Sequence, residues 1–296
     1  MGVNHPAADP TGRLYSPCVT VDQAMINEAC DLLGVDEREQ LKDGGQKTVR
    51  LVERGGDPYV LKVITVGGSS PQALQRAARE VDLLRTLDSP HVVKAVSVLQ
   101  MLGGDKENGA AWLEEFLDGE DLADTLTGPW GWDRARDLGI QIARGLGAMH
   151  AQRVVHRDLS ANNIRCTSNG IVKVMDPGVA RYELLPPVTL GGHPGTPGFC
   201  SPEHLKPPPA GPTAFSDVFC LGILIWMALI GVSPIPYEGD LDDYLERLSR
   251  VQIRDEASVR SGIPPEQFAF LKTCLHPQPA RRFRDGNAAA EELESV

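Results

Sequence analysis

The sequence has few of the features that mark exported, disulfide-bonded or zinc-binding proteins. Its six cysteines stand at scattered positions, and none belongs to a C-x-x-C pair. This scatter argues against a disulfide framework and against a zinc site built from paired cysteines. The N-terminus has no basic segment followed by an apolar run, which an export signal would need. We therefore expect reduced thiols and a cytoplasmic protein.

An excess of positive charge and long apolar runs are also missing. The formal net charge is −11 and the pI is about 5.1. Proteins that bind phosphate backbones need clustered Lys and Arg, so we expect no nucleic-acid partner. One apolar stretch, residues 218–232, is shorter than the ~20 residues that a membrane span requires. It predicts a buried helix and no membrane insertion.

The chain is long enough to bury a full core. Its 296 residues, 42% of them apolar, fit one large domain or two lobes. Residues 1–19 are rich in Pro, Gly and polar groups and indicate a loose arm. Thr20 and Gln23 resemble a capping box, apolar residues follow at helical spacing, and Gly34 can end the helix. Residues 1–40 are therefore predicted to be an N-terminal extension with one amphipathic helix, structural or regulatory in role.

The pattern changes to strands from Leu41 onward. Strands are predicted at 48–52 and 59–64, with glycine pairs before the first and between the two. A helix at 71–87 and a hairpin near 103–109 follow. The second half is mainly helical, and Asp133 can cap its first helix. The helices predicted there span residues 133–150, 218–232, 241–249, 265–275 and 287–294.

A polar loop between short apolar runs, within residues 154–178, carries the residue types that bind hard cations. A Ser-Asn-Gly turn at 168–170 predicts a hairpin after the loop, which would gather Asp158, Asn163 and Asp176 at one end of a small sheet. A carboxylate and a carboxamide on converging loops supply oxygen ligands for Mg²⁺, usually together with substrate phosphates. The second carboxylate, Asp158, is then placed to orient a hydroxyl nucleophile.

The spacing in this loop resembles the catalytic loop of protein kinases. Residues 156–163 match the pattern H-R-D-L-x-x-x-N. Asp176 and Gly178 match two positions of that family's D-F-G, and Pro177 stands at the third. Because Asp-Pro-Gly alone also fits an ordinary β-turn, the resemblance depends on further motifs.

Those motifs follow in the family's order over about residues 41–290. Lys62 lies in an apolar strand where the family has V-A-I-K, and Glu80 stands at the interval of the family's lysine partner. Taken alone, a strand lysine is more simply an exposed residue and a glycine turn is only a hairpin. The family's Gly-rich phosphate loop corresponds here to Gly44, Gly45, Lys47 and Val49. Of these residues, only Gly44 stands at a position where the family has glycine.

Two further stretches add to the match. Residues 112–119 resemble the hinge between the two kinase lobes, whose backbone contacts adenine. Residues 195–203 closely resemble the G-T-x-x-Y-x-A-P-E end of a serine/threonine kinase activation segment. In the family, the residue at Asp217 holds the catalytic loop's backbone, and the residue at Arg282 pairs with the one at Glu203.

The chain is therefore identified as similar to the eukaryotic-like serine/threonine protein kinases, and frequent Ala, Gly and Arg with few Lys indicates a bacterial source. The resemblance implies an α+β, bilobal protein kinase fold, with a small β-rich N-lobe carrying one regulatory helix at 41–117 and a mainly helical C-lobe at 118–296. It also implies an enzyme that uses ATP and Mg²⁺ to phosphorylate Ser or Thr hydroxyls of a protein substrate.

The resemblance assigns a role to each site residue. Asn163 and Asp176 would hold Mg²⁺, Lys62 steadied by Glu80 would neutralise phosphate charge, and Asp158 would accept the hydroxyl proton. Thr196 would support Asp158 and the substrate hydroxyl. Contacts to the nucleotide are expected from Gly44, Gly45, Lys47, Val49, Val60, Lys62, Glu115, Phe116, Leu117 and Arg165.

Several positions near the nucleotide depart from the family pattern, namely Val60, Glu114, Ser160, Arg165 and Pro177. None of them removes a metal ligand or the hydroxyl-orienting carboxylate, so an active kinase is favoured over a pseudokinase that binds nucleotide or partners as a scaffold. A small-molecule phosphotransferase of the antibiotic or choline kinase type shares the Asp/Asn/Asp chemistry. It typically has Gly at the position of Arg157 and lacks a segment like 195–203, which argues against it.

Arg157 also indicates control through the activation segment. Kinases with this Arg commonly use it to bind a phosphorylated residue of that segment. Thr189 is the candidate acceptor, and an unmodified loop threonine is the equally weighted alternative.

Overall fold

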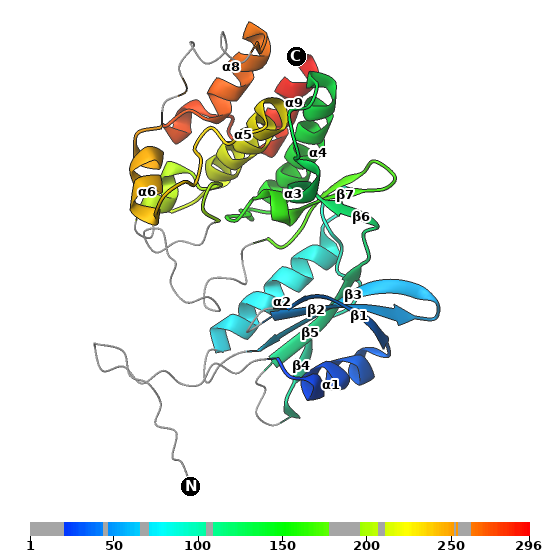
Figure 1. The fold of residues 1–296 in the computed structure, drawn as a ribbon. Helices are drawn as coiled ribbons and strands as arrows, with labels where there is room; N and C mark the ends of the chain where they lie inside the picture. The colour runs from blue at the N-terminus through cyan, green and yellow to red at the C-terminus, as the bar shows by residue number, and fades with distance from the viewer. Residues whose placement is uncertain are drawn as a thin grey trace, which may run out of the picture. The chain divides into compact units, whose positions relative to one another are not determined.

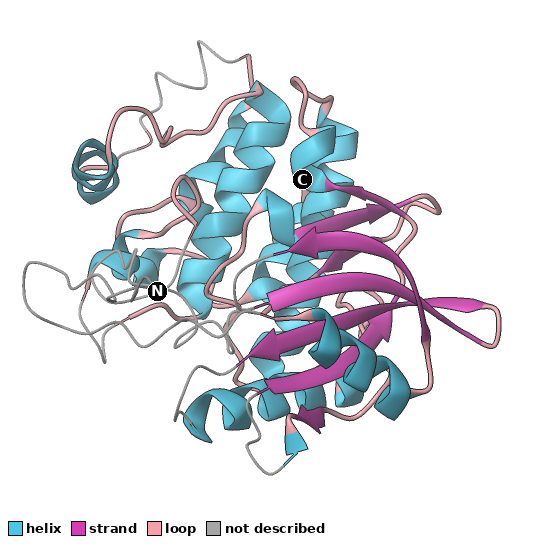
Figure 2. Ribbon diagram, turned by 60° about the horizontal axis from the view of Figure 1, so that its bottom comes forward, coloured by secondary structure: helices cyan, strands magenta, loops and turns pink. Residues whose placement is uncertain are grey.

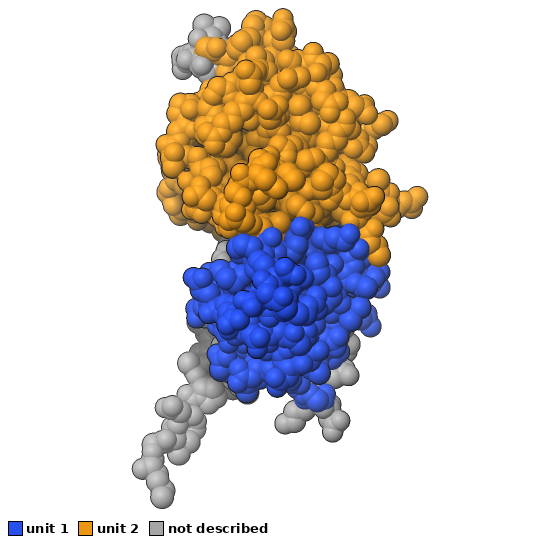
Figure 3. All heavy atoms as spheres, turned by 90° about the vertical axis from the view of Figure 1, so that its right-hand side faces the viewer, with its two compact units in different colours: residues 1–85, 94–116 blue, residues 86–93, 117–296 orange. Residues whose placement is uncertain are grey.

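The computed structural model describes residues 21–43, 47–65, 71–104, 109–177, 196–206, 211–251, 253 and 262–296. The chain divides into two compact units, one made of residues 1–85 and 94–116 and the other of residues 86–93 and 117–296 (Figure 3). The boundary after which the rest of the chain belongs to the second unit falls between Phe116 and Leu117, one residue before the predicted end of the N-lobe. The strands of the first unit and the mainly helical second unit give the predicted α+β composition (Figure 2).

The first unit contains a five-stranded antiparallel sheet with strand order β1-β2-β3-β5-β4. Although the pattern changes to strands from Leu41, the first strand predicted, residues 48–52, is the second strand of this sheet, and the strand before it was missed. Residues 36–40 of the missed strand are exposed and mostly charged, as suits an edge strand, so they show no apolar alternation that could reveal it. The strands are β1 (Asp36–Asp43), β2 (Lys47–Arg54), β3 (Asp57–Thr65), β4 (Gln100–Leu102) and β5 (Gly109–Glu115).

The predicted N-terminal helix is α1 (Gln23–Leu33), and it packs on the sheet of the first unit against β3, β4 and β5 (Figure 1). The side chain of Asp22 accepts a hydrogen bond from the backbone N–H of Met25 at 2.9 Å, so the cap predicted at Thr20 is wrong. Gly34 ends the helix in the left-handed conformation with φ 63°, as predicted. The helix and the sheet share one apolar core of Met25, Ile26, Ala29, Leu33, Val35, Val52, Leu61, Val63, Leu102, Ala111 and Leu113.

The helix predicted at 71–87 is α2 (Pro71–Thr86). Its buried side chains include Ala77, Val81 and Leu84, which recur at helical spacing. Glu80, on the same helix, is also buried. The backbone N–H of Ala95 donates to the carbonyl of Leu84 at 3.2 Å and ties the end of the helix to the segment that leads to β4.

The second unit consists of helices and one small antiparallel sheet of β6 (Gly119–Asp121), β7 (Ile164–Thr167) and β8 (Val172–Val174). Helix α5 is buried along most of its length, which confirms the buried helix predicted at 218–232. Among the described residues, no helix combines the length and apolar character needed to cross a bilayer. The helices are α3 (Leu122–Thr125), α4 (Trp132–Ala151), α5 (Ala214–Ile230), α6 (Leu241–Ser249), α8 (Pro265–Cys274) and α9 (Gly286–Ser295).

Helix α4 is in contact with α5, α9 and β8 within the second unit (Figure 1). Its N-cap is Gly131, so the cap predicted at Asp133 is wrong, and this carboxylate instead lies in the first turn, where it complements the helix dipole. Gly139 allows close packing, because a Cβ there would lie 2.6 Å from Ile225 Cδ1 and 3.0 Å from Leu293 Cδ1. The chain leaves α4 at Ala151 and enters the predicted polar loop.

Candidate active site

The backbone of the polar loop is held by Asp217, a buried residue in the first turn of α5. Its carboxylate accepts hydrogen bonds from the backbone N–H groups of His156, at 2.7 Å, and Arg157, at 3.0 Å. Arg157 has φ 67°, a left-handed conformation that costs a non-glycine residue free energy. Asp217 thus takes the place that the resemblance implied and fixes a strained backbone beside Asp158.

His150, at the end of α4, fixes Asp217 in turn. The backbone N–H of Gly286 donates to Nδ1 of His150 at 3.1 Å, so Nδ1 is an acceptor and Nε2–H donates to Asp217 Oδ2 at 2.9 Å. Burial raises the pKa of the Asp217 carboxyl, but the hydrogen bonds from His150 and from the backbone N–H of His156 outweigh it, and the pKa is lowered. Sequence gave no signal for this role of His150.

His156 is a structural residue of the loop, as predicted. Its ring is fully buried, and the backbone N–H of Asp158 donates to its Nδ1 at 3.3 Å. Its Nε2–H therefore donates to the carbonyl of Met175, at 2.9 Å. The ring joins the loop before Asp158 to the segment before Asp176.

The carboxylate of Asp158 is held from two sides and is buried. The hydroxyl of Thr196 donates to Oδ1 at 2.7 Å. The amide nitrogen of Asn163 donates to Oδ2 at 3.3 Å and to the backbone carbonyl of Asp158 at 2.8 Å. Three residues that sequence singled out thus lie together, and each Asp158 oxygen has a defined direction.

The oxygens of Asn163 and Asp176 suit a hard divalent cation. Because the amide nitrogen of Asn163 faces Asp158, its Oδ1 points elsewhere and accepts no hydrogen bond from the described residues. The N–H of Met175 donates to the Asn163 backbone carbonyl at 2.8 Å, which brings the chain just before Asp176 to this residue. Amide and carboxylate oxygens on adjacent segments fit the donor set that Mg²⁺ takes. Pro177 is buried, and Gly178 lies outside the described residues.

Arg165, on β7, contacts Leu117, the first residue of the segment 117–296 of the second unit. Its Nε–H donates to the carbonyl of Leu117 at 3.1 Å, and its Nη1 lies 2.9 Å from Asp121 Oδ1. The pair is partly exposed, so its charge attraction is screened by water. The sequence had placed both Arg165 and Leu117 at the nucleotide, and the structure brings these two together.

The first unit carries the predicted phosphate-binding lysine. Lys62, on β3, is buried, and its Nζ lies 2.6 Å from Oε2 of Glu114 on β5. Sequence alone marks Glu114 only as a departure from the family pattern and does not predict this contact. Glu80 on α2, which the sequence predicts as the partner of Lys62, is also buried.

The remaining predicted nucleotide contacts of the first unit lie on its strands. Val49 and Val60 are half-buried on β2 and β3, and Lys47 begins β2. The carboxylate of Glu115 accepts a hydrogen bond from the backbone N–H of Lys94 at 2.8 Å. Gly44 and Gly45 lie outside the described residues.

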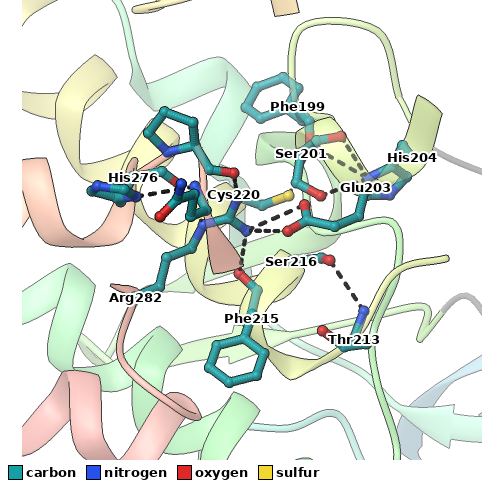
Figure 4. A network of polar contacts seen from close by, with 12 residues as sticks. Phe199, Ser201, Glu203, His204, Thr213, Phe215, Ser216, Cys220, His276 and Arg282 are labelled. Atoms are coloured by element: carbon teal, nitrogen blue, oxygen red, sulfur yellow. Dashed lines mark hydrogen bonds and ion pairs between the residues drawn. The ribbon is translucent and has the colours of Figure 1, made fainter. Parts of the chain in front are cut away.

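A network of polar contacts holds the segment that follows Thr196 (Figure 4). The N–H of Ser201 donates to Nδ1 of His204 at 3.0 Å, so Nε2–H of that ring donates to the carbonyl of Arg157 at 3.1 Å. The carboxylate of Glu203 pairs with Arg282, as the resemblance implied. His204 thereby connects this segment to the loop that carries Asp158. The sequence missed this role, and Thr189 lies outside the described residues.

Comparison with known proteins gives matches over nearly the whole chain. Residues 36–293 match the family described as protein kinase domain. The serine/threonine-protein kinase PknA of Corynebacterium glutamicum is 29% identical over 274 residues, which are 90% of this chain and 57% of that protein. PknA of Mycobacterium tuberculosis is 28% identical, over 85% of this chain and 58% of its own length. Mitogen-activated protein kinase kinase 7 of Arabidopsis thaliana is 26% identical, over 88% of this chain and 84% of its own. The chain thus spans well under two thirds of these two bacterial relatives.

Proposed function

Because this chain belongs to the protein kinase domain family, we propose that it is a serine/threonine protein kinase that transfers the γ-phosphoryl group of ATP, with Mg²⁺, to Ser or Thr hydroxyls of a protein substrate. The observation that carries the proposal is the arrangement at Asp158. Its carboxylate lies between the Thr196 hydroxyl and the Asn163 amide, in a loop with the H-R-D-L-x-x-x-N spacing.

Asp158 accepts the proton of the substrate hydroxyl in this proposal. The hydrogen bonds from Thr196 and Asn163 fix the direction of its two oxygens before substrate arrives. A preset carboxylate orients the attacking oxygen and avoids the entropic cost of ordering it during the reaction. The backbone of the loop stays in place because Asp217 holds it.

Asn163 and Asp176 would hold Mg²⁺, which supplies positive charge to the β- and γ-phosphates when bound. Lys62 supplies a further positive charge to the phosphates. The oxygen donors of Asn163 and Asp176, with the Asn163 amide nitrogen turned toward Asp158, support the metal assignment. Glu80 is proposed to steady Lys62. The nucleotide contacts proposed in addition are Gly44, Gly45, Lys47, Val49, Val60, Glu115, Phe116, Leu117 and Arg165.

We also propose that the enzyme activates itself by phosphorylation of Thr189. Arg157, whose backbone is fixed by Asp217 and His204, supports this as the group that would bind the phosphate. Mass spectrometry of protein made with intact Asp158 should find phosphate on Thr189, and protein carrying Asp158→Asn should have none. An unmodified Thr189 in the active protein would remove self-activation from the proposal and leave phosphotransfer.

The second candidate is a pseudokinase that binds nucleotide or partners without phosphotransfer. Arg165 supports it, because this charged residue stands at the sequence position where kinases have an aliphatic adenine floor, and its contacts with Leu117 and Asp121 hold the guanidinium in the same unit. The discriminating experiment measures transfer of labelled phosphate from ATP with Mg²⁺, for the unchanged chain and for Asp158→Asn. The kinase proposal requires labelling that Asp158→Asn abolishes. No labelling with either protein, together with thermal stabilisation by ATP, would establish the scaffold instead.

A further inference from the structure

Strands β3 and β5 carry two buried charged residues, Lys62 and Glu114, on one face of the sheet. Lys62 lies opposite Trp112, and Val60 lies opposite Glu114, so these four side chains share a face. The alternate residues of the same strands, including Leu61, point to the other face, into the core shared with α1. Lys62 and Glu114 are therefore diagonal neighbours, close enough for long side chains to meet.

The contacts of Glu114 account for both of its carboxylate oxygens. Oε2 lies 2.6 Å from Lys62 Nζ, and the side chains of this pair are only 6% and 4% exposed. Oε1 accepts a hydrogen bond from the indole N–H of Trp112 at 2.8 Å. An ionised carboxylate is an acceptor only, and both its partners are donors. Because the indole fixes Oε1, the direction of Oε2 toward Lys62 is set by the sheet itself.

We infer that Glu114 is a positioning residue of this kinase, which holds the ammonium of Lys62 from the neighbouring strand. The inference rests on the proposed function. Lys62 and Glu114 belong to strands that are hydrogen-bonded in continuous register from Tyr59–Glu115 to Thr65–Gly109. The position of the Lys62 ammonium is therefore built into the sheet, and its placement does not rest on the α2 residue Glu80 alone.

The contact between Lys62 and Glu114 is strong because both groups are charged and buried. A charge-assisted contact between buried groups is little weakened by salt, because solvent ions do not reach it. Removing Glu114 takes from the buried ammonium of Lys62 one of the charges that compensate it. Without Glu114, Lys62 would move, and a displacement of about 1 Å in a reacting group can lower a rate by roughly a hundredfold.

The test compares Glu114→Gln with the unchanged protein. Gln has the shape of Glu and can still accept the indole hydrogen bond, but it lacks the charge. We expect kcat per ATP-binding site to fall at least about tenfold. We expect ATP to bind no more weakly, because the site also loses a negative charge that opposes the phosphates. A merely structural role predicts the opposite result, fewer binding sites with an unchanged kcat per site.

A matched control is Glu53→Gln, in the same unit. Glu53 pairs with Arg38 at 3.1 Å, but the two side chains are 37% and 51% exposed. Exposed pairs contribute little, so this variant should keep the kcat and the ATP affinity of the unchanged protein. A tenfold loss in Glu53→Gln would mean that any charge removed from the sheet slows the enzyme, and would overturn the inference.

A spectroscopic measurement separates this inference from the proposed function. In protein labelled with ¹⁵N at the lysine side chains, the Lys62 ammonium signal is the one that Lys62→Arg removes. It should shift or broaden in Glu114→Gln and stay in place in Glu53→Gln. If the unchanged protein transfers no phosphate, the proposed function fails, yet this signal still tests the pair. An unmoved signal, or a kcat per site within twofold of the unchanged protein, would overturn the inference.

Should Glu114→Gln fail to fold, Trp112→Phe provides the same test. Phe keeps an aromatic ring at this buried position, although a smaller one, and removes the N–H that fixes Oε1 of Glu114. The Lys62 signal should shift, and kcat per site should fall severalfold. If Trp112→Phe leaves both unchanged, the proposed anchoring of Lys62 through Glu114 is wrong.

Discussion

Nη1 of Arg282 lies 2.9 Å from Oε1 of Glu203, and the two side chains are 0% and 5% exposed. The same guanidinium donates to the carbonyl of His276 at 2.7 Å and to that of Phe215 at 2.9 Å (Figure 4). It also lies over the ring of Phe219, 4.7 Å from its centroid. One cation thereby joins the segment after Thr196, the start of α5 and the segment that leads to α9.

Replacing this cation by a smaller one should destabilise the protein. Arg282→Lys keeps the charge but loses the planar fork that reaches several acceptors at once. We expect the free energy of unfolding to fall by about 1–3 kcal/mol, because buried acceptors that the guanidinium satisfied are left without a donor. Urea unfolding measures the change. Arg284→Lys, in an exposed pair with Asp285, should change it by less than about 0.5 kcal/mol. A loss of under about 1 kcal/mol in Arg282→Lys would contradict the prediction.

Among the polar contacts around the candidate active site, two could be predicted from sequence and two could not. The partners of Asp217 and the Glu203–Arg282 pair followed from motifs that resemble the kinase family. The roles of His150 and His204 did not, because each pairs with a residue far away in the chain and belongs to no local pattern. Such contacts are created by the packing of helices and loops, which periodicity does not specify.

The elements show the same contrast. The amphipathic helix α6 was predicted with its observed bounds, because apolar residues repeat at helical spacing along it. Strand β1 was missed, because an exposed edge strand has no buried face to mark it. Glu114 was noticed only as a misfit, since a carboxylate in an apolar strand becomes intelligible once the register places it beside Lys62.

The Thr196 hydroxyl should matter for the proposed reaction through its 2.7 Å hydrogen bond to Asp158. Thr196→Val keeps the shape and removes the donor, so Asp158 Oδ1 loses its fixed direction. We expect kcat for phosphotransfer to fall by roughly ten- to a hundredfold. Thr196→Ser restores the hydroxyl and should recover most of the rate in the same steady-state assay. If Thr196→Val keeps more than half of the rate, the hydroxyl does not orient Asp158.

His204 should make the stability of the fold depend on pH. Burial lowers the pKa of its ring below the ordinary value of 6.5, because protonation would place a charge in the interior. As the pH falls below 6.5, the unfolded chain takes up a proton before the folded one does. The stability due to the neutral ring is therefore complete above pH 6.5 and is lost as the pH falls through the folded pKa. Urea unfolding at pH 7.5 and 5.5 should show this loss, and His204→Gln should reduce it. An equal loss in the variant would assign it to other groups.

Gly109, at the start of β5, should be needed for the packing of α1 on the sheet. A Cβ at this position would meet the methyl group of Met25 and would lie 2.8 Å from the carbonyl oxygen of Ile64. The Met25 side chain can turn away, but the Ile64 carbonyl belongs to a strand and cannot. We therefore expect Gly109→Ala to lower the free energy of unfolding by about 1–3 kcal/mol. Gly128→Ala is the control, because a Cβ there meets nothing within 4 Å. Equal stability of the two variants in urea would show that β5 shifts freely beneath α1.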